Sequence, residues 1–240
     1  MTLPRKLTVE FIGTFFLMFT IGTAVATAGS LAPLAIGSVL MVMVFAGGHI
    51  SGGHYNPAVS TAVLARGKMA AGEYVPYVVA QLAASVLAAL LVRGLGYGPR
   101  HAAAVAGTGK ILIAEFLFTF ALCFVVLNVA TARGTENNSF YGLAIGFTVA
   151  AGAFAVGGIS GGSFNPAVAL GASVLGRFAW SHIWIYVLAE LAAGLVAAAA
   201  FLFTQLSEKP DGDVREVEPD DGVGRTAIDP ATGRVSREAA

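Results

Sequence analysis

The sequence predicts an all-α membrane protein in which six transmembrane helices and two shorter half-helices form an inverted repeat. Three observations lead to this fold class: uncharged stretches longer than one membrane span, six apolar segments of spanning length, and two copies of one polar motif. The chain has 240 residues, of which 56% are hydrophobic and only 12% are charged. Because a soluble domain has about 25% charged residues, most of this chain is expected to lie in lipid.

Charged residues are missing from two long parts of the sequence. No Asp, Glu, Lys or Arg occurs in residues 11–65 or in residues 137–176. A spanning helix needs roughly 20 apolar residues, so the first stretch is long enough for two spans and part of a third. It follows Arg5 and Lys6, as a signal peptide would. However, it is longer than the ~7–15 residues of a signal core and has no cleavage motif, so we interpret its start as the first span.

The charge lies mostly at the C-terminal end. Residues 207–240 contain half of all charged side chains and are polar and poor in aromatic residues. Such a composition is typical of a disordered, solvated segment. We therefore divide the chain into a membrane domain, 1–206, and a charged, disordered tail, 207–240.

Six apolar segments of the membrane domain are expected to be transmembrane helices. They cover residues 7–28, 34–47, 74–92, 110–131, 140–156 and 183–205. Two shorter apolar segments remain, Pro57–Ala65 and Pro166–Leu175. At 1.5 Å per residue each is roughly 14 Å long, about half of a ~30 Å hydrocarbon core, so neither crosses alone.

The two halves of the membrane domain repeat each other. Glu10 opens EFIGTFFLMF and Glu115 opens EFLFTFALCF, while HISGGHYNPAVS in the first half matches GISGGSFNPAVA in the second. The repeats cover about 5–93 and 110–206, and each contains three spans and one half-helix. An odd number of spans means that the second copy enters the membrane from the opposite side, which places a functional site near the midplane.

Each half-helix begins with the tripeptide Asn-Pro-Ala, at Asn56-Pro57-Ala58 and at Asn165-Pro166-Ala167. Asn is a favoured N-cap residue and Pro is favoured at the first helical position. A glycine-rich loop precedes each motif, and irregular backbone at membrane depth is tolerated where it lines a watery cavity. We therefore expect a pore lined by the backbone carbonyls of Gly52, Gly53, His54, Gly161, Gly162 and Ser163.

The half-helix N-termini are expected to meet at the midplane, where each contributes roughly half a positive elementary charge. Two positive ends beside a narrow pore disfavour cations, including hydronium. The side-chain amides of Asn56 and Asn165 can donate hydrogen bonds to a passing neutral oxygen. The motif thus predicts passage of small uncharged hydroxylated molecules and rejection of ions.

These features together resemble the aquaporins of the major intrinsic protein family, over about residues 5–205. The resemblance rests on Glu10 and Glu115, on GHISGGHYNPAVS with His49 and His54, on SGGSFNPA, and on the segment 74–82 that ends in Ala-Gln-Leu. It implies a right-handed bundle of six transmembrane helices with two re-entrant half-helices, one pore per subunit, and a homotetramer. It also implies that Glu10 and Glu115 brace the re-entrant loops, which we favour over a role in proton transfer.

Orientation follows from the resemblance, because the basic residues outside the tail divide almost evenly, five against four, between the two sides. It implies that both termini are cytoplasmic and that the protein is a multi-pass protein of the cell membrane, which we assign to a bacterial inner membrane.

The resemblance also identifies a second constriction, the selectivity filter, formed by Ile36, Ala153, Gly162 and Val168. The last position is nearly always Arg in aquaporins, and strict water channels have an aromatic residue at the first and His at the second. Val168 neither narrows the pore with a charged side chain nor donates hydrogen bonds. In this respect the chain resembles an aquaglyceroporin-like bacterial branch associated with arsenic handling, although the Asp typical of glycerol facilitators is replaced by Ala169.

The sequence therefore predicts a passive channel for water and small uncharged solutes, such as glycerol, urea and metalloid hydroxides like arsenous acid. One alternative is an ordinary water-selective aquaporin. Others are an alternating-access transporter of a small neutral solute and a junction protein with a vestigial pore. No pattern in the sequence indicates an enzyme, a cofactor or nucleic-acid binding. A metal site is not expected either, since His49 and His54 have no Cys or carboxylate companion.

Overall fold

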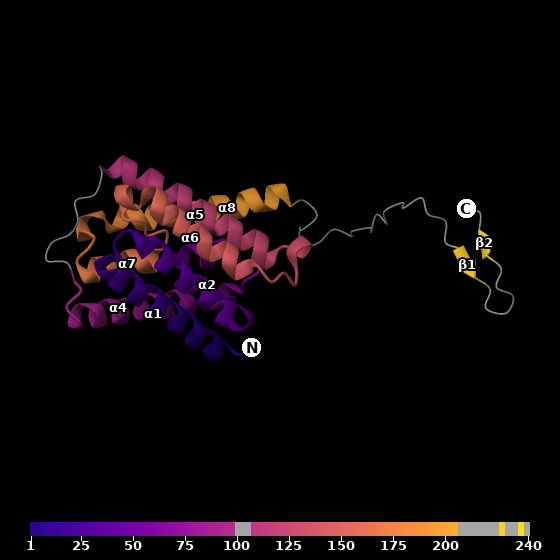
Figure 1. The fold of residues 1–240 in the computed structure, drawn as a ribbon, viewed down its shortest axis with the longest axis horizontal. Helices are drawn as coiled ribbons and strands as arrows, with labels where there is room; N and C mark the ends of the chain where they lie inside the picture. The colour runs from indigo at the N-terminus through magenta and orange to yellow at the C-terminus, as the bar shows by residue number, and fades with distance from the viewer. Residues whose placement is uncertain (99–106, 206–225, 229–234, 238–240) are drawn as a thin grey trace. The chain divides into compact units, whose positions relative to one another are not determined.

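The computed structural model describes residues 1–98, 107–205, 226–228 and 235–237. The chain divides into two compact units, Met1–Pro210 and Asp211–Ala240. The first unit is a bundle of helices that run side by side (Figure 1).

The first unit has, among its described residues, six helices that are long and apolar enough to cross a membrane. They are α1 (Leu3–Thr27), α2 (Ala32–Ser51), α4 (Ala71–Gly94), α5 (Thr108–Thr131), α6 (Tyr141–Ser160) and α8 (Ile183–Thr204). Three short 3₁₀ turns lie between them, at Gly29–Leu31, Arg133–Thr135 and Trp180–His182. The predicted all-α membrane fold with six spans is confirmed.

The two half-helices are also present, with the bounds that the sequence predicted. They are α3 (Pro57–Ala65) and α7 (Pro166–Leu175), of nine and ten residues. Each begins at the proline of an Asn-Pro-Ala motif and follows a helix of the bundle through a short irregular loop. Helices α1–α4 and α5–α8 thus form the two halves of the inverted repeat.

Helices α2 and α6 are longer than the sequence indicated, because we expected each to end four residues earlier, at the first glycines of its glycine-rich segment. They continue to Ser51 and Ser160. Each ends only at the next glycine, Gly52 or Gly161, which adopts the left-handed conformation with φ 93°. This is the conformation for which glycine is favoured just after a helix, so a glycine inside the helix did not mark its end.

Each half-helix packs against the last long helix of the opposite repeat: α3 against α8, and α7 against α4. Gly194 on α8 allows the first of these contacts, since a Cβ atom there would lie 2.6 Å from the carbonyl oxygen of Ala58. Ser85 on α4 makes the corresponding contact in the second, where its hydroxyl donates to the carbonyl of Ala167. The start of each half-helix is therefore held by the other half of the molecule.

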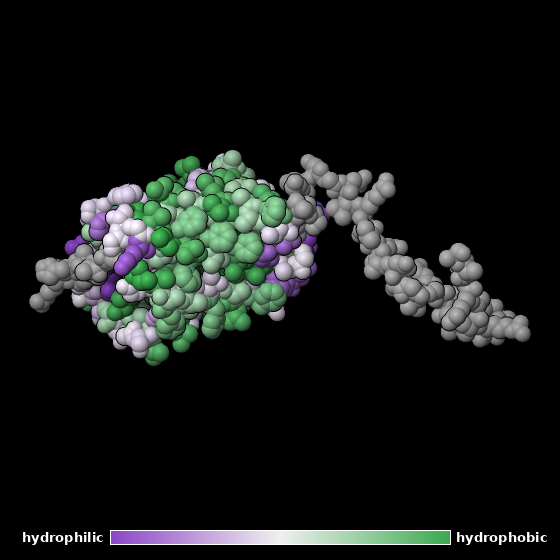
Figure 2. All heavy atoms as spheres, turned by 90° about the horizontal axis from the view of Figure 1, so that it is seen from above, coloured by the Kyte–Doolittle hydropathy of each residue, from purple (hydrophilic) through white to green (hydrophobic). Residues whose placement is uncertain are grey.

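The outer surface of the bundle is apolar. In the view of Figure 2, hydrophobic residues cover the middle of the molecule and hydrophilic residues gather at its two ends. Large apolar side chains on the long helices, such as Ile113, Phe147 and Leu195, are more than half exposed. An exposed apolar face of this extent is suited to the hydrocarbon of a bilayer.

In the second unit, the structure describes two short strands, β1 (Thr226–Ile228) and β2 (Val235–Arg237). They pair antiparallel, with Ala227 opposite Ser236. We had expected a tail without regular structure, but β-branched residues in both segments favour strands. The rest of the tail lies outside the described residues.

Candidate functional site: the central pore

The two Asn-Pro-Ala motifs form the same cap structure. The side-chain oxygen of Asn56 accepts a hydrogen bond from the backbone N–H of Ala58 at 2.8 Å, and that of Asn165 accepts one from Ala167 at 3.0 Å. Both asparagines have extended backbone, and a proline opens the helix that follows. The caps satisfy one of the unpaired N–H groups at each helix start.

The amide groups of the two asparagines cross from one half of the molecule to the other. Asn56 Nδ2 donates to the carbonyl oxygen of Phe164 at 2.8 Å, and Asn165 Nδ2 donates to that of Tyr55 at 2.9 Å. From the sequence we expected these amides to serve a passing solute. Because an amide group has two hydrogens, each asparagine has one beyond this bond, and both side chains line the central cavity.

Tyr55 and Phe164 have positive φ angles, 49° and 52°, which residues with a side chain rarely adopt. This conformation turns the carbonyl of each residue toward the asparagine of the opposite half. Two carboxylates hold the loops in it. Glu10 accepts the N–H groups of His54 and Tyr55 at 2.9 and 2.7 Å, and Glu115 accepts those of Ser163 and Phe164 at 3.1 and 2.7 Å.

Both carboxylates are fully buried, and each lies behind its loop and not in the pore wall. Their hydrogen bonds join each carboxylate to the loop of its own half. The first brace also accepts the hydroxyl of Ser51 at 2.7 Å and the side-chain amide of Gln81 at 2.8 Å. The second loop is held in addition by Glu190 on α8, which accepts the N–H of Asn165 at 2.9 Å.

A narrow cavity runs between the two loops at the centre of the bundle. Its volume is about 20 Å³, and one water molecule needs roughly 10–15 Å³. Its polar lining comes from both loops, and its apolar lining comes from helices of both halves: Leu17, Ile21, Ile36, Leu40, Val59, Leu122, Val126, Ile145, Val149 and Val168. This segment therefore has room for about one water molecule between apolar walls.

Three of the four predicted filter residues line this cavity: Ile36, Gly162 and Val168. Ala153 does not line it and lies behind Gly162, where a Cβ atom on that glycine would be 3.5 Å from the Ala153 Cα. Val149, one turn earlier on α6, faces the cavity. Val149 was not among the residues predicted from the sequence.

The predicted carbonyl-lining residues occupy different places. Gly53, His54, Gly162 and Ser163 line the central cavity, whereas Gly52 lines only the wider vestibule described below. Gly161 is exposed but lines neither space, and a Cβ atom on it would clash with the Phe178 ring. The ring of His54 lies at the junction of the two spaces, with Nδ1 3.0 Å from the Ser60 hydroxyl.

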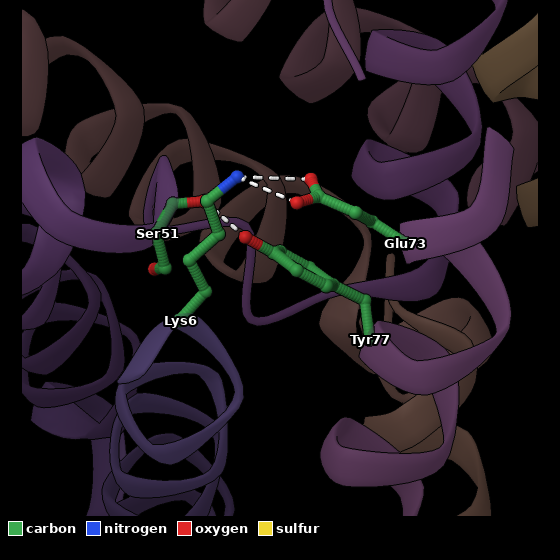
Figure 3. A network of polar contacts seen from close by, with 4 residues as sticks. All are labelled: Lys6, Ser51, Glu73 and Tyr77. Carbon is green, nitrogen blue, oxygen red and sulfur yellow. Dashed lines mark hydrogen bonds and ion pairs between the residues drawn. The ribbon is translucent and has the colours of Figure 1, made fainter. Parts of the chain in front are cut away.

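A vestibule of about 730 Å³ opens on the side of the N-terminus. At its rim, Lys6 Nζ donates to both oxygens of the Glu73 carboxylate at 2.8 and 2.9 Å, which joins the start of α1 to the start of α4. Beside this pair, the Tyr77 hydroxyl donates to the carbonyl of Ser51 at 2.8 Å (Figure 3). Within the part of the chain that the structure describes, no three His, Cys, Asp or Glu residues come close enough together to hold a metal ion.

Comparisons with known proteins agree with this architecture. The family model described as "Major intrinsic protein" matches residues 1–201. The chain is 37% identical over 207 residues to glycerol uptake facilitator protein-like 6 of Lactiplantibacillus plantarum, which covers 81% of this chain and 95% of that protein. It is also 37% identical over 219 residues to aquaporin NIP1-3 of Oryza sativa subsp. japonica, covering 86% and 76%.

Among solved structures, the fold is similar to that of the aquaglyceroporin from Plasmodium falciparum. The TM-score is 0.70 over 87% of this chain and 97% of that chain, at 21% sequence identity. At this identity the likeness concerns the fold alone.

Proposed function

The chain belongs to the major intrinsic protein family and is a multi-pass membrane channel for water and small solutes, and we propose that its solutes include glycerol, urea and uncharged metalloid hydroxides such as arsenous acid. Members of this family are passive channels, and we infer that this protein has no enzymatic activity. The proposal also includes a homotetramer in a bacterial inner membrane, with both termini in the cytoplasm and the channel formed by residues 1–206.

The observation that carries this proposal is the position of Val168 in the wall of the central cavity. Val168 directly follows the second motif, and together with Ile36 and Gly162 it provides no charged or hydrogen-bonding side chain. The polar groups available to a solute are then loop carbonyls and the asparagine amides. These can exchange hydrogen bonds with any small hydroxylated molecule.

The volume of the central cavity supports the alternative of a water-selective channel, because it holds about one water molecule. Glycerol or arsenous acid needs more room, so the side chains of Ile36 and Val168 must change rotamer as these solutes pass. Such apolar side chains have no hydrogen bonds to break, which is the physical reason for favouring the broader pore.

Ion exclusion rests, in this proposal, on the two half-helix N-termini at the centre of the bundle. Each carries roughly half a positive charge, and no filter arginine adds to them. Proton leak is therefore expected to exceed that of a channel with an arginine at the position of Val168.

Stopped-flow measurements on proteoliposomes test the proposal, with water, glycerol, urea and arsenous acid offered separately. Fast flux of water together with at least one larger solute is expected, with linear dependence on concentration. Rapid water flux with exclusion of every larger solute would establish the water-selective alternative. Saturable or proton-coupled flux would instead favour a transporter, and no flux at all would favour a vestigial pore.

A further inference from the structure

Gln81 on α4 and Glu190 on α8 occupy equivalent positions in the two repeats. They are 109 residues apart, as are the motif asparagines Asn56 and Asn165. Neighbouring contacts follow the same correspondence, since the hydroxyls of Tyr77 and Tyr186, also 109 residues apart, each donate to the carbonyl of the serine that ends the preceding long helix. The repeats thus place an amide in one half where the other has a carboxyl group.

In the first half, the amide completes the hydrogen bonding of the brace. Gln81 Nε2 donates to Glu10 Oε2 at 2.8 Å, and the same oxygen accepts the N–H of Tyr55 at 2.7 Å. Glu10 Oε1 accepts from Ser51 and from the N–H of His54. Every donor around Glu10 is a neutral group whose hydrogen is present at any ordinary pH, so a single ionised carboxylate is fully satisfied there.

In the second half, the same place brings two carboxyl groups together. Glu115 accepts the N–H groups of Ser163 and Phe164, while Glu190 Oε1 accepts that of Asn165. These three N–H groups belong to consecutive residues, so the carboxyl groups of Glu115 and Glu190 lie side by side behind the loop, although two ionised carboxylates have no hydrogen to share. Glu190 Oε2 is buried and has no donor among the described residues.

Among the residues that the structure describes, no cation compensates for a second negative charge at this place. Both side chains are fully buried. The other titratable groups that face them are Cys123 on α5 and Tyr186 on α8, neither of which carries positive charge. Half-helices α3 and α7 and helix α6 contain no charged residue, and Lys110 lies at the exposed start of α5. Two adjacent buried charges of one sign are strongly disfavoured, and a shared proton is the usual resolution.

We propose that Glu190 is a carboxylic acid whose Oε2 hydrogen is donated to Glu115, so that the Glu115–Glu190 pair is a proton-binding site behind the second pore loop. In this state the hydrogen of Glu190 completes the second brace as the Gln81 amide hydrogen completes the first, while Glu190 Oε1 also accepts the N–H of Asn165. The difference is that the donor of Glu190 can be removed by alkali, whereas that of Gln81 cannot.

The site connects proton binding to the pore through Asn165. The Glu190 carboxyl holds the N–H of this residue, whose side chain caps α7 and lines the central cavity. While the proton is bound, the second loop has the support that the first loop has. When rising pH removes it, two neighbouring carboxylates repel each other and the loop 161–165 loses that support. Conduction and thermal stability are therefore expected to fall on the alkaline side only.

Infrared difference spectroscopy of the full-length protein in lipid vesicles tests the assignment, because a protonated carboxyl group has a C=O stretching band separate from that of a carboxylate. The wild-type protein should show this band at neutral pH, and Glu190→Gln should abolish it. The control Glu73→Gln, at the vestibule rim, should leave it unchanged. Absence of the band in the wild-type protein, or its persistence in Glu190→Gln, would overturn the proposal. This readout does not depend on which solute permeates.

The variant Gln81→Glu provides an independent test, since it places a second carboxyl group beside Glu10 in the first half. A second protonated-carboxyl band is expected in this variant, and its absence would count against the proposal even if Glu190→Gln failed to fold. Water permeability measured against pH completes the test: it should decline at alkaline pH in the wild-type protein and stay level in Glu190→Gln. Equal profiles for both would show that the pair does not influence the pore.

Discussion

Asn56 Nδ2 donates a hydrogen bond of 2.8 Å to the carbonyl oxygen of Phe164, a residue of the opposite repeat. Asn165 and Tyr55 make the reciprocal bond at 2.9 Å. The same two asparagines cap the half-helices, so one side chain fixes the start of its own half-helix and the loop of the other. The pore loops of the two halves are therefore parts of one hydrogen-bonded unit.

The double role of the asparagine can be separated by substitution. Asn56→Ala removes both the cap and the bond to Phe164 and is expected to cost about 1–3 kcal/mol of stability. Asn56→Ser retains a capping oxygen but cannot reach Phe164, so it should lose less stability than Asn56→Ala. Thermal unfolding in detergent measures both variants. Equal stability of wild-type protein and Asn56→Ala would mean that neither bond contributes.

Replacement of Glu10, the brace of the first half, should destabilise the protein more than replacement of Glu190 in the second half. Glu10→Gln puts an amide N–H₂ group where four donors converge, and since bonds to charged groups contribute about 1.5–3 kcal/mol each, a loss above about 2 kcal/mol is expected. Glu190→Gln reproduces the arrangement at Gln81 and should cost little at neutral pH. The two melting temperatures, measured side by side, check this ranking.

An arginine introduced at the filter should restrict the pore. Val168→Arg brings a large charged side chain into the cavity wall and should lower glycerol, urea and arsenous acid flux at least tenfold, with a smaller effect on water. Val168→Thr, which has a similar volume and no charge, should behave like the wild-type protein. Unchanged flux in a folded Val168→Arg channel would place this residue outside the path.

The ion pair at the vestibule rim is expected to contribute little to stability. Lys6 and Glu73 side chains are each 24% exposed, and pairs accessible to solvent are typically worth about 0.2–1 kcal/mol. A double-mutant cycle with Lys6→Ala and Glu73→Ala should give a coupling energy in this range that decreases at high salt. A coupling well above it, insensitive to salt, would indicate that the pair is buried in the membrane-embedded protein.

The contact between α8 and the first half-helix depends on a missing side chain. In Gly194→Ala the new Cβ atom would lie 2.6 Å from the Ala58 carbonyl, a backbone atom that cannot move freely, so a loss of about 1–3 kcal/mol is expected. Gly158→Ala on α6 is the matched control, because no atom lies within 4 Å of its Cβ position. The control should be neutral or slightly stabilising. Similar melting temperatures for the two variants would contradict this packing.

Much of the architecture follows from local sequence signals. The half-helices begin where predicted because Asn and Pro together specify a helix start, and their length follows from the apolar run. The ends of α2 and α6 were missed because several glycines in a row offer more than one stopping place, and tertiary contacts decide which is used. Val149 also lines the central cavity, although no sequence motif marks this position.

The functional contacts between the halves could not be predicted. Nothing in the tripeptide indicates that the Asn56 amide bonds to Phe164, because the two residues are 108 positions apart. The pairing of Glu115 with Glu190, within the second half, was missed for a related reason: the repeat relates Glu190 to Gln81, but only the fold brings it to the brace. This pairing depends on the close packing of α5 against α8.

The packing of each half-helix on the far repeat also has a consequence for biogenesis. During synthesis, α3 leaves the ribosome long before α8, which provides Gly194 for its start. The first re-entrant segment therefore cannot complete its packing until almost the entire bundle has been inserted into the membrane. Two separately expressed repeats should accordingly be immature alone and should complete each other's half-helices when they are produced in the same cell.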